Sequence, residues 1–544
     1  MRSRIAAAAL LSAALAGCGG AGRERAYLGN LHAHTRLSDG VAEPAPAFAR
    51  ARSIRLSFLA LTDHGEDLGP QEWRELKAAA RAASAPGRFA ALAGWEWSSP
   101  TEGHFLVLGT GEAGSSCSAP RSLEELARWT RRWGGLLIYA HPGAFEEFGS
   151  VLASALEGHD VAGQEVGSLY SGPPGSGYAY HDYEDAYREA LRRGLKVGAL
   201  INQDNHHEQV GDARRGGLTG VWMRRLGAAE LLQALRARRC YGTEAAGVSV
   251  DFEINRVRMG GTLRTKSPLE VQAFLQGLHA GIVFVRAELW AARAGQPVWT
   301  WLRYDRGRPL VARLPPPARP EVYYFRAEMR AMYGVVARAF SSPLWVERGA
   351  DPILRGLAVE PSWPALERPA IARVRIENAG PEPSTGGELR LTGEGGFSWN
   401  QPVPVLSPRG GLTVRLPLVT MLEHETLQAE LMVPGASGPQ LRGLWSVDSC
   451  AADSGPATIE LRDLDGRLVQ SAQIQVSGCM PADQALRGLF PLDLCGGLLR
   501  RVGPLSADAQ THLEVLVDGS RAEVGLAKLP LRAGHTLTIR PRPR

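Results

Sequence analysis

Histidine and acidic side chains that could bind metal ions are concentrated in the first two-fifths of this 544-residue chain. Nine of the thirteen histidines lie between His32 and His207, and only four lie in the 337 residues that follow. A single histidine could equally cap a loop or bond a backbone carbonyl, but the concentration favours a metal site. Imidazole and carboxylate together suit Zn, Mn or Fe. The candidate ligands are His32, His34, Asp39, His64, Glu96, His104, His141, Asp204 and His206.

Short apolar runs precede several of these residues, at 58–61, 89–92, 136–140 and 197–201. Runs of this length bounded by Gly, Pro and Asp are typical of strands buried on both faces. Helical stretches lie between them, at 71–83, 122–133, 182–193 and 228–239. Alternating strands and helices predict a parallel sheet closed into an α/β barrel over residues 27–250. In such barrels chemistry collects at the C-terminal ends of the strands, where these ligands fall.

Beyond about residue 250 the apolar pattern changes to the period of two that is typical of β-strands. We expect a β-sandwich over 251–350, an Ig-like β-sandwich over 351–445 and a small β domain over 446–544. The fold class is therefore α/β, followed by all-β sandwich-like domains. These β domains carry no set of catalytic residues. They could serve as a stalk or packing partner, or as a surface- or glycan-binding accessory.

The N-terminus resembles a bacterial lipoprotein precursor. A charged start at 1–4 precedes an apolar stretch at 5–14, and Leu15-Ala16-Gly17-Cys18 resembles a lipobox. The apolar stretch is too short to span a membrane as a mature helix. We expect a signal peptide over 1–18 that is cleaved before Cys18, lipid on Cys18, and a tether over 19–26. Neither Gly19 nor Gly20 is an aspartate, so outer-membrane or periplasm-facing attachment in the cell envelope is expected.

The composition indicates no nucleic-acid partner. The formal charge of +5 comes from 57 arginines and four lysines, 61 basic residues together, against 56 acidic ones. No run of clustered basic residues with interleaved aromatics supports nucleic-acid binding. Five cysteines remain after Cys18, and one disulfide could form among the last three of them. The oligomeric state cannot be inferred.

The motifs that carry the candidate ligands resemble those of one known superfamily. Residues 30–40, Asn-Leu-His-Ala-His-Thr-Arg-Leu-Ser-Asp-Gly, resemble the opening motif of the PHP (polymerase and histidinol phosphatase) superfamily. Four further segments of the chain resemble the later motifs of the superfamily and follow in the same order. They are Thr62-Asp63-His64, Glu96 with His104, Ala140-His141-Pro142 and Asp204-Asn205-His206. The resemblance covers approximately residues 27 to 245. Residues 94–97, the lipoprotein-like start and the appended β domains look most like CehA/McbA-type metallohydrolases.

This resemblance implies a distorted (β/α)7 PHP barrel that holds two to three divalent transition metals. It assigns His32, His34, Glu96 and Asp204 to one metal. It assigns Glu96, His104 and His141 to a second metal, so that Glu96 bridges the two. It assigns Asp39, His64 and His206 to a third metal. No ligand of the family pattern is missing, which favours an active enzyme.

The implied activity is that of a metal-dependent hydrolase acting on a small-molecule ester. The resemblance implies a metal-bound hydroxide as nucleophile at a trinuclear site. We expect a phosphoesterase, because three metals suit a tetrahedral phosphoryl group. Two alternatives stay open, namely a hydrolase of carboxylic esters, amides or carbamates of the CehA/McbA type, and a non-catalytic cell-envelope binding protein.

Further residues are candidates for roles around the metals. Glu96 is the expected catalytic carboxylate. Asp63 could orient a ligating imidazole or cap a helix, and His207 could donate a proton to the leaving group or be an ordinary loop histidine. Glu165 and Arg214 are candidate substrate-binding residues, although arginine is abundant throughout the chain.

Overall fold

The computed structural model describes residues 24–99, 102–113, 120, 122–142, 161–171, 178–192, 194–207, 217–278, 281–331, 336–350, 352–360, 364, 366–378, 380–422, 424–433, 441–449, 454–495, 498–507, 511–522 and 529–543. Cys18 and Arg214, expected to carry lipid and to bind substrate, lie outside these residues. Among the helices of the described part, none is long and apolar enough to cross a membrane.

The N-terminal part is built on a sheet of short, buried strands. Their bounds are β1 (Arg25–Asn30), β2 (Phe58–Leu61), β3 (Ala90–Ser99), β4 (Gly103–Leu108), β5 (Leu136–Ala140), β6 (Val161–Ser171), β7 (Tyr178–Asp182) and β8 (Gly198–Asn202). β1, β2 and β3 pair in parallel, as do β5, β6 and β8. The segment after β8 returns to the segment after β1, where Asn205 pairs with Ala33 and its carbonyl accepts a 2.8 Å hydrogen bond from the His34 amide.

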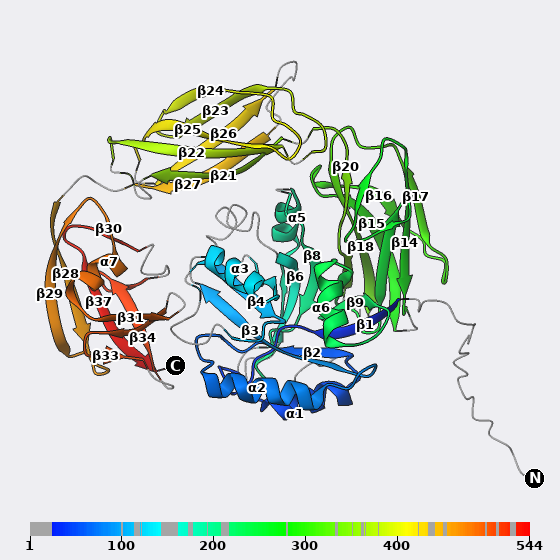
Figure 1. Ribbon diagram of the computed structural model, residues 1–544, viewed down its shortest axis with the longest axis horizontal. Coiled ribbons are helices and arrows are strands. Elements are labelled where there is room, and N and C mark those ends of the chain that lie inside the picture. The colour runs from blue at the N-terminus through cyan, green and yellow to red at the C-terminus, as the bar shows by residue number, and fades with distance from the viewer. Residues whose placement is uncertain are drawn as a thin grey trace, which may run out of the picture.

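Helices cover the outside of this sheet. They are α1 (Pro44–Ser53), α2 (Pro70–Ala83), α3 (Leu123–Arg132), α5 (Glu184–Arg192) and α6 (Ala228–Arg236). α1 and α2 begin with proline, which is favoured in the first helical turn because its missing N–H has no partner there. The side chain of Ser122 caps α3 by accepting from the Glu125 amide. α1 and α2 lie side by side below β2 (Figure 1).

The sheet is mixed, and a regular (β/α)7 repeat is not shown. β4 runs antiparallel to both β3 and β5, and β7 runs antiparallel to β6. β9 (Leu218–Met223) runs antiparallel to β1, and β10 (Cys240–Thr243) runs antiparallel to β9. Only three residues separate β3 from β4. Such a link allows a hairpin, whereas parallel strands need a crossover of a dozen residues or more.

The first β-rich part shares its sheet with the N-terminal part. One of its sheets contains β12 (Val257–Arg258), β11 (Ser249–Ile254), β14 (Leu269–Gln276) and β17 (Leu310–Leu314). The other contains β13 (Thr262–Arg264), β15 (Ile282–Ala291), β16 (Gln296–Trp301), β18 (Glu321–Ala331), β19 (Val336–Ser341) and β20 (Leu344–Glu347). β19 pairs with β10, so the hydrogen-bonded sheet runs across the domain boundary expected at residue 250.

Two further β-rich parts follow, each with its own core. The first has a sheet of β21 (Pro352–Glu360), β22 (Pro369–Asn378) and β25 (Gly411–Val419), and a sheet of β24 (Ser398–Val403), β23 (Gly387–Gly393), β26 (His424–Met432) and β27 (Leu441–Asp448). Leu389, Leu416 and Leu431 are in the core that the two sheets enclose. Figure 1 shows the β-rich parts arranged around the N-terminal part.

The last part combines small sheets with one helix, α7 (Ala482–Leu489). Its main sheet contains β29 (Leu468–Ser477), β28 (Ser454–Arg462), β37 (Thr536–Pro543), β34 (Thr511–Val517) and β35 (Ser520–Arg521). The shorter pairs are β30 (Met480–Pro481) with β36 (Pro530–Leu531), and β31 (Leu492–Cys495) with β32 (Leu498–Val502) and β33 (Leu505–Ser506). Cys479 is disulfide-bonded, and Cys240 on β10 is a buried free thiol.

Candidate metal centre

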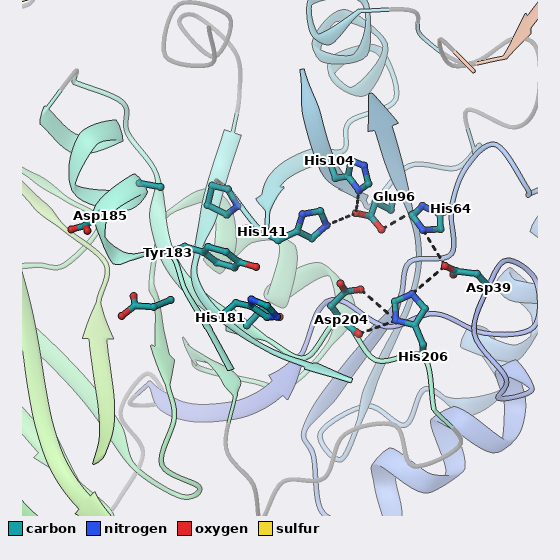
Figure 2. A pocket seen from close by; sticks show the side chains of 14 residues that line it. Asp39, His64, Glu96, His104, His141, His181, Tyr183, Asp185, Asp204 and His206 are labelled. Atoms are coloured by element: carbon teal, nitrogen blue, oxygen red, sulfur yellow. Dashed lines mark hydrogen bonds and ion pairs between the residues drawn. The ribbon is translucent and has the colours of Figure 1, made fainter. Parts of the chain in front are cut away.

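The nine predicted ligands converge at one edge of the N-terminal sheet. His32, His34 and Asp39 follow β1, His64 follows β2, and His141 follows β5. Glu96 and His104 lie on β3 and β4, and Asp204 and His206 follow β8. Three groups of these side chains could each hold a metal ion, and within each group one ligand atom per residue lies within 4.8 Å of all the others. Figure 2 shows seven of the nine side chains around one cavity.

The first group is His32, His34, Glu96 and Asp204. The two Nε2 atoms of His32 and His34 are 3.2 Å apart, and each lies 3.2 Å from Glu96 Oε2 and 3.1 Å from Asp204 Oδ1. Four bonds of about 2.0–2.1 Å in tetrahedral geometry place the ligand atoms about 3.3 Å apart. This spacing of nitrogen and oxygen atoms therefore fits a tetrahedral metal ion.

The second group shares Glu96 with the first. Glu96 Oε1 lies 2.9 Å from His104 Nδ1 and 3.1 Å from His141 Nε2, while Oε2 faces the first group. The third group contains His64 and His206, whose Nε2 atoms lie 3.6 Å and 3.3 Å from Asp39 Oδ2. His34 belongs to this group as well, with its Nδ1 atom 3.4 Å from Asp39 Oδ1. That addition was not expected from the sequence.

The buried carboxylates at the centre favour the binding of positive charge. Burial lowers the pKa of His34, but hydrogen bonds and charge from Asp204 and Glu96 outweigh it and raise the pKa to about 10. Burial raises the pKa of Glu96, but the surrounding histidines hold it well below its usual value. Among the described residues no lysine or arginine pairs with Glu96, Asp204 or Asp39. Divalent cations fit this set of ionised, buried oxygens and imidazoles.

Glu165 lies behind the ligands instead of facing a substrate. Its carboxylate is completely buried, and Oε1 lies 3.1 Å from His32 Nδ1 and accepts from Asn202 Nδ2 at 3.0 Å. Its Oε2 accepts from the His141 amide at 2.7 Å. A carboxylate on the second ring nitrogen fixes the tautomer and orientation of a ligating imidazole. The substrate-binding role expected for Glu165 is therefore replaced by a positioning role.

Asp63 holds the loop that joins two ligands. It accepts hydrogen bonds from the amide and hydroxyl of Thr35 at 2.6 and 2.9 Å, and from the Ser38 hydroxyl at 2.9 Å. Burial raises the pKa of Asp63. Among the described residues, no imidazole is hydrogen-bonded to Asp63, and the next helix is capped by Gly69. Asp63 therefore acts on the loop between His34 and Asp39, not in either expected role.

A cavity of about 740 Å³ opens in front of the metal groups. Besides the ligands, its lining includes Ser168 on β6, His181 and Asp182 on β7, and Tyr183. The Tyr183 hydroxyl points across the cavity toward Asp204 (Figure 2). The Ser168 hydroxyl is buried and has no hydrogen-bond partner among the described atoms. Neither residue was predicted, because nothing in the sequence marks a lone hydroxyl on a strand.

His207 does not belong to the described lining of this cavity. It is half-buried, and its amide donates to Asn205 Oδ1 at 2.9 Å. The proton-donor role expected for His207 thus gains no support from its position. Tyr183 faces the cavity instead, and burial together with Glu165 and Asp204 raises the pKa of its hydroxyl. That hydroxyl keeps its proton at neutral pH and can donate a hydrogen bond.

Comparisons with known proteins give distant likenesses. No family model matches the chain. It is 24% identical over 334 residues to an uncharacterized protein of Chlamydia pneumoniae, a match that covers 55% of this chain and 53% of that protein. The match thus spans about half the length of this relative.

Two solved structures are similar to parts of the chain. One is a two-domain protein of Bacteroides vulgatus containing a predicted PHP-like metal-dependent phosphoesterase. It has a TM-score of 0.34 and 13% identity, and the match covers 73% of this chain and 96% of that chain. The other is an amidohydrolase of Chromobacterium violaceum, with a TM-score of 0.24 and 22% identity, covering 33% of this chain and 87% of that chain.

Proposed function

We propose that the chain is a metal-dependent hydrolase of the PHP superfamily that acts on a small-molecule ester. The observation that carries this proposal is the arrangement of nine His, Asp and Glu side chains in three overlapping groups, with seven of the nine lining one cavity. Structural metal sites are usually closed, whereas catalytic sites keep a position open to solvent. These groups border a cavity, which favours catalysis over a purely structural role.

Each part of the proposed reaction has residues to support it. Divalent metals held by the three groups would supply a bound water of lowered pKa and would polarise an ester oxygen. Glu165 keeps His32 in the tautomer whose Nε2 faces the metal groups, and Asp63 keeps the loop after His34 in place. From the cavity lining, the protonated Tyr183 hydroxyl donates a hydrogen bond to a substrate oxygen, and the Ser168 hydroxyl offers a second polar contact.

We propose a phosphate ester as the first substrate class, because three adjacent metal groups match the three non-bridging oxygens of a phosphoryl group. A specific observation favours a second class. The described lining of the cavity contains Asp182 and Asp185 but no lysine or arginine. Without side-chain cations, an uncharged carboxylic ester, amide or carbamate would be bound more readily than a phosphate dianion.

The test begins with the metal content of protein purified without chelators, followed by assays after loading with Zn, Mn or Fe. p-Nitrophenyl phosphate, bis(p-nitrophenyl) phosphate and p-nitrophenyl acetate separate the substrate classes. We expect two to three metals per chain and hydrolysis of at least one substrate. Tyr183→Phe should lower kcat/KM while leaving the metal content unchanged. Less than one metal per chain and no hydrolysis by any loaded form would leave the alternative of a non-catalytic envelope protein.

We also propose that the protein is attached to a membrane of the cell envelope through lipid on Cys18. Support comes from the lipobox-like sequence Leu15-Ala16-Gly17-Cys18 that follows an apolar stretch. Mass spectrometry of protein extracted from bacterial membranes should find a diacylglyceryl group on Cys18. Cys18→Ala should yield unprocessed or soluble protein. A wild-type protein with an unmodified N-terminus beyond Cys18 would contradict this proposal.

A further inference from the structure

The connection between β16 and β17, residues 302–309, displays positive charge and one apolar side chain. Arg303, Arg306 and Arg308 are exposed, and Leu302 is 73% exposed. With Asp305, the 302–309 loop has a net charge of +2. None of its three arginines forms an ion pair with any residue of the described chain.

Two arginines of the adjoining strands are paired instead. On β15 and β18, Arg286 pairs with Glu328 at 3.1 Å and Arg326 pairs with Glu184 at 3.2 Å. Those arginines are held by intramolecular charges, whereas the guanidinium groups of the 302–309 loop are available to an external anion.

The loop has a fixed place at one end of the molecule. The Tyr304 hydroxyl donates to the Leu275 carbonyl at 2.5 Å, and its ring packs against Phe284 at a centroid distance of 5.6 Å. Leu275 lies at the end of β14, and its neighbours Phe274 and Gln276 line a second cavity. Glu24 and Arg25, at the start of β1, line the same cavity. The 302–309 loop and the start of β1 are therefore at the same end of the molecule.

Chain length ties this end to the expected lipid. Cys18 lies seven residues before Arg25. Seven residues span at most about 25 Å when fully extended. A lipid on Cys18 would therefore hold the start of β1, and with it the 302–309 loop, close to the bilayer surface.

We propose that the 302–309 loop docks on an anionic phospholipid surface. Arg303, Arg306 and Arg308 bind lipid phosphates, and Leu302 enters the interface between headgroups and acyl chains. The charge and placement of the loop stand on the described structure, and the lipid on Cys18 proposed above brings them to the membrane. This role goes beyond hydrolysis, because it orients the molecule on its membrane.

The experiment uses the chain from Gly19 onward, which keeps every described residue and lacks both Cys18 and the apolar leader. Its binding is measured by flotation with vesicles of phosphatidylcholine alone, or of phosphatidylcholine mixed with phosphatidylglycerol. We expect binding to the mixed vesicles only, weakened by high salt. Each arginine near such a surface contributes roughly fivefold, so Arg303→Gln, Arg306→Gln and Arg308→Gln together should weaken binding about 100-fold. Leu302→Ser should weaken the binding that survives at high salt.

A matched triple variant, Arg375→Gln, Arg390→Gln and Arg415→Gln, removes the same charge. These three arginines are exposed, lie in the sheets of the 352–448 part and form no ion pair with a described residue. We expect this variant to bind as the unchanged chain does. Equal weakening by the two triple variants, or equal binding to both kinds of vesicle, would overturn the docking proposal. Because no lipid is attached in this assay, its result is independent of whether Cys18 is lipidated and whether the centre hydrolyses esters.

Discussion

Glu96 is the residue on which two of the three metal groups depend. Its Oε1 and Oε2 atoms face different groups, and its side chain is 1% exposed. Glu96→Gln keeps the shape but removes the charge and one of the two acceptor oxygens. We expect metal content to fall and hydrolysis to drop by on the order of 10²-fold or more.

Elemental analysis and steady-state rates check this expectation. Glu388→Gln is the matched control, because Glu388 is exposed on β23, outside the N-terminal part. A Glu96→Gln protein that keeps its metals and its rate would show that the assignment of ligands is wrong.

The histidines of the metal-free centre make metal loading dependent on pH. Burial lowers the pKa of His64, but Glu96 and Asp39 raise it to about 10, and the pKa of His34 is raised to about 10 as well. Both imidazoles are therefore protonated at pH 7.5, whereas a metal binds only the neutral ring. Loading at this pH should release protons, and the apparent affinity should rise with pH up to about 10.

A pH-indicator dye in weakly buffered solution measures this release during a metal titration. We expect at least one proton per chain, because His34 and His64 each hold one at this pH. A titration that binds metal with no change in pH would contradict the charge state described for the metal-free centre.

Residue types and spacing are enough to predict the nine side chains that the structure brings together in three groups, because each follows or ends a recognisable apolar run or motif. They are not enough to predict what Glu165 does. Its contact with His32 joins residues 133 positions apart, and only the pairing of β6 with β8 brings the carboxylate behind the imidazole. Tyr183 was not predicted either, because a tyrosine near a strand end is common. Its role depends on the cavity, which forms only in the folded chain.

At the scale of elements, the close approach of β1 and β2 positions the first two histidines. A Cβ atom at Gly29 would lie 2.3 Å from the Phe58 carbonyl oxygen and 2.4 Å from its ring. Gly29→Ala should push the two strands apart just before His32. We expect a loss of about 1–3 kcal/mol in the free energy of unfolding, together with weaker metal binding.

Urea denaturation and metal competition with a chromophoric chelator measure these two effects. Gly111→Ala is the matched control, because a Cβ atom there would meet nothing within 4 Å. If both variants behave alike, the spacing between β1 and β2 does not control the centre.

The apolar runs predict the strands better than they predict the directions of those strands. β2 and β5 have the predicted bounds, and β8 is displaced by one residue from its predicted start. β4 and β9 were missed, and both run antiparallel to a neighbour. An apolar run buried on both faces has the same composition in either direction, so the sequence predicts a buried sheet but not a mixed one.

At the scale of the whole molecule, the hydrophobic cores predict how the protein unfolds. Leu28 packs against a core of the N-terminal part and against the core of the first β-rich part, so these two parts are joined by side chains as well as by the sheet. The cores of the 352–448 and 454–543 parts share no residue with them. We expect residues 24–350 to unfold as one unit, separately from the two later parts.

Calorimetry with and without EDTA tests this division. Removal of bound metal should lower the unfolding temperature of the 24–350 unit by roughly 5 °C or more. The unfolding temperatures of the two later parts should not change. A shift shared by every transition would show instead that the four parts unfold together.

The pairing of β10 with β19 limits which segments of such a protein can be exchanged between genes. Tyr241, Gly242 and Thr243 pair with Ser341, Phe340 and Ala339. A gene fragment that stops at codon 250 would encode an N-terminal part with this strand edge open, which is a template for aggregation. Recombination between genes can therefore exchange the modules after residue 350 more readily than it can separate residues 24–250 from the first β-rich part, because that separation would open the shared sheet.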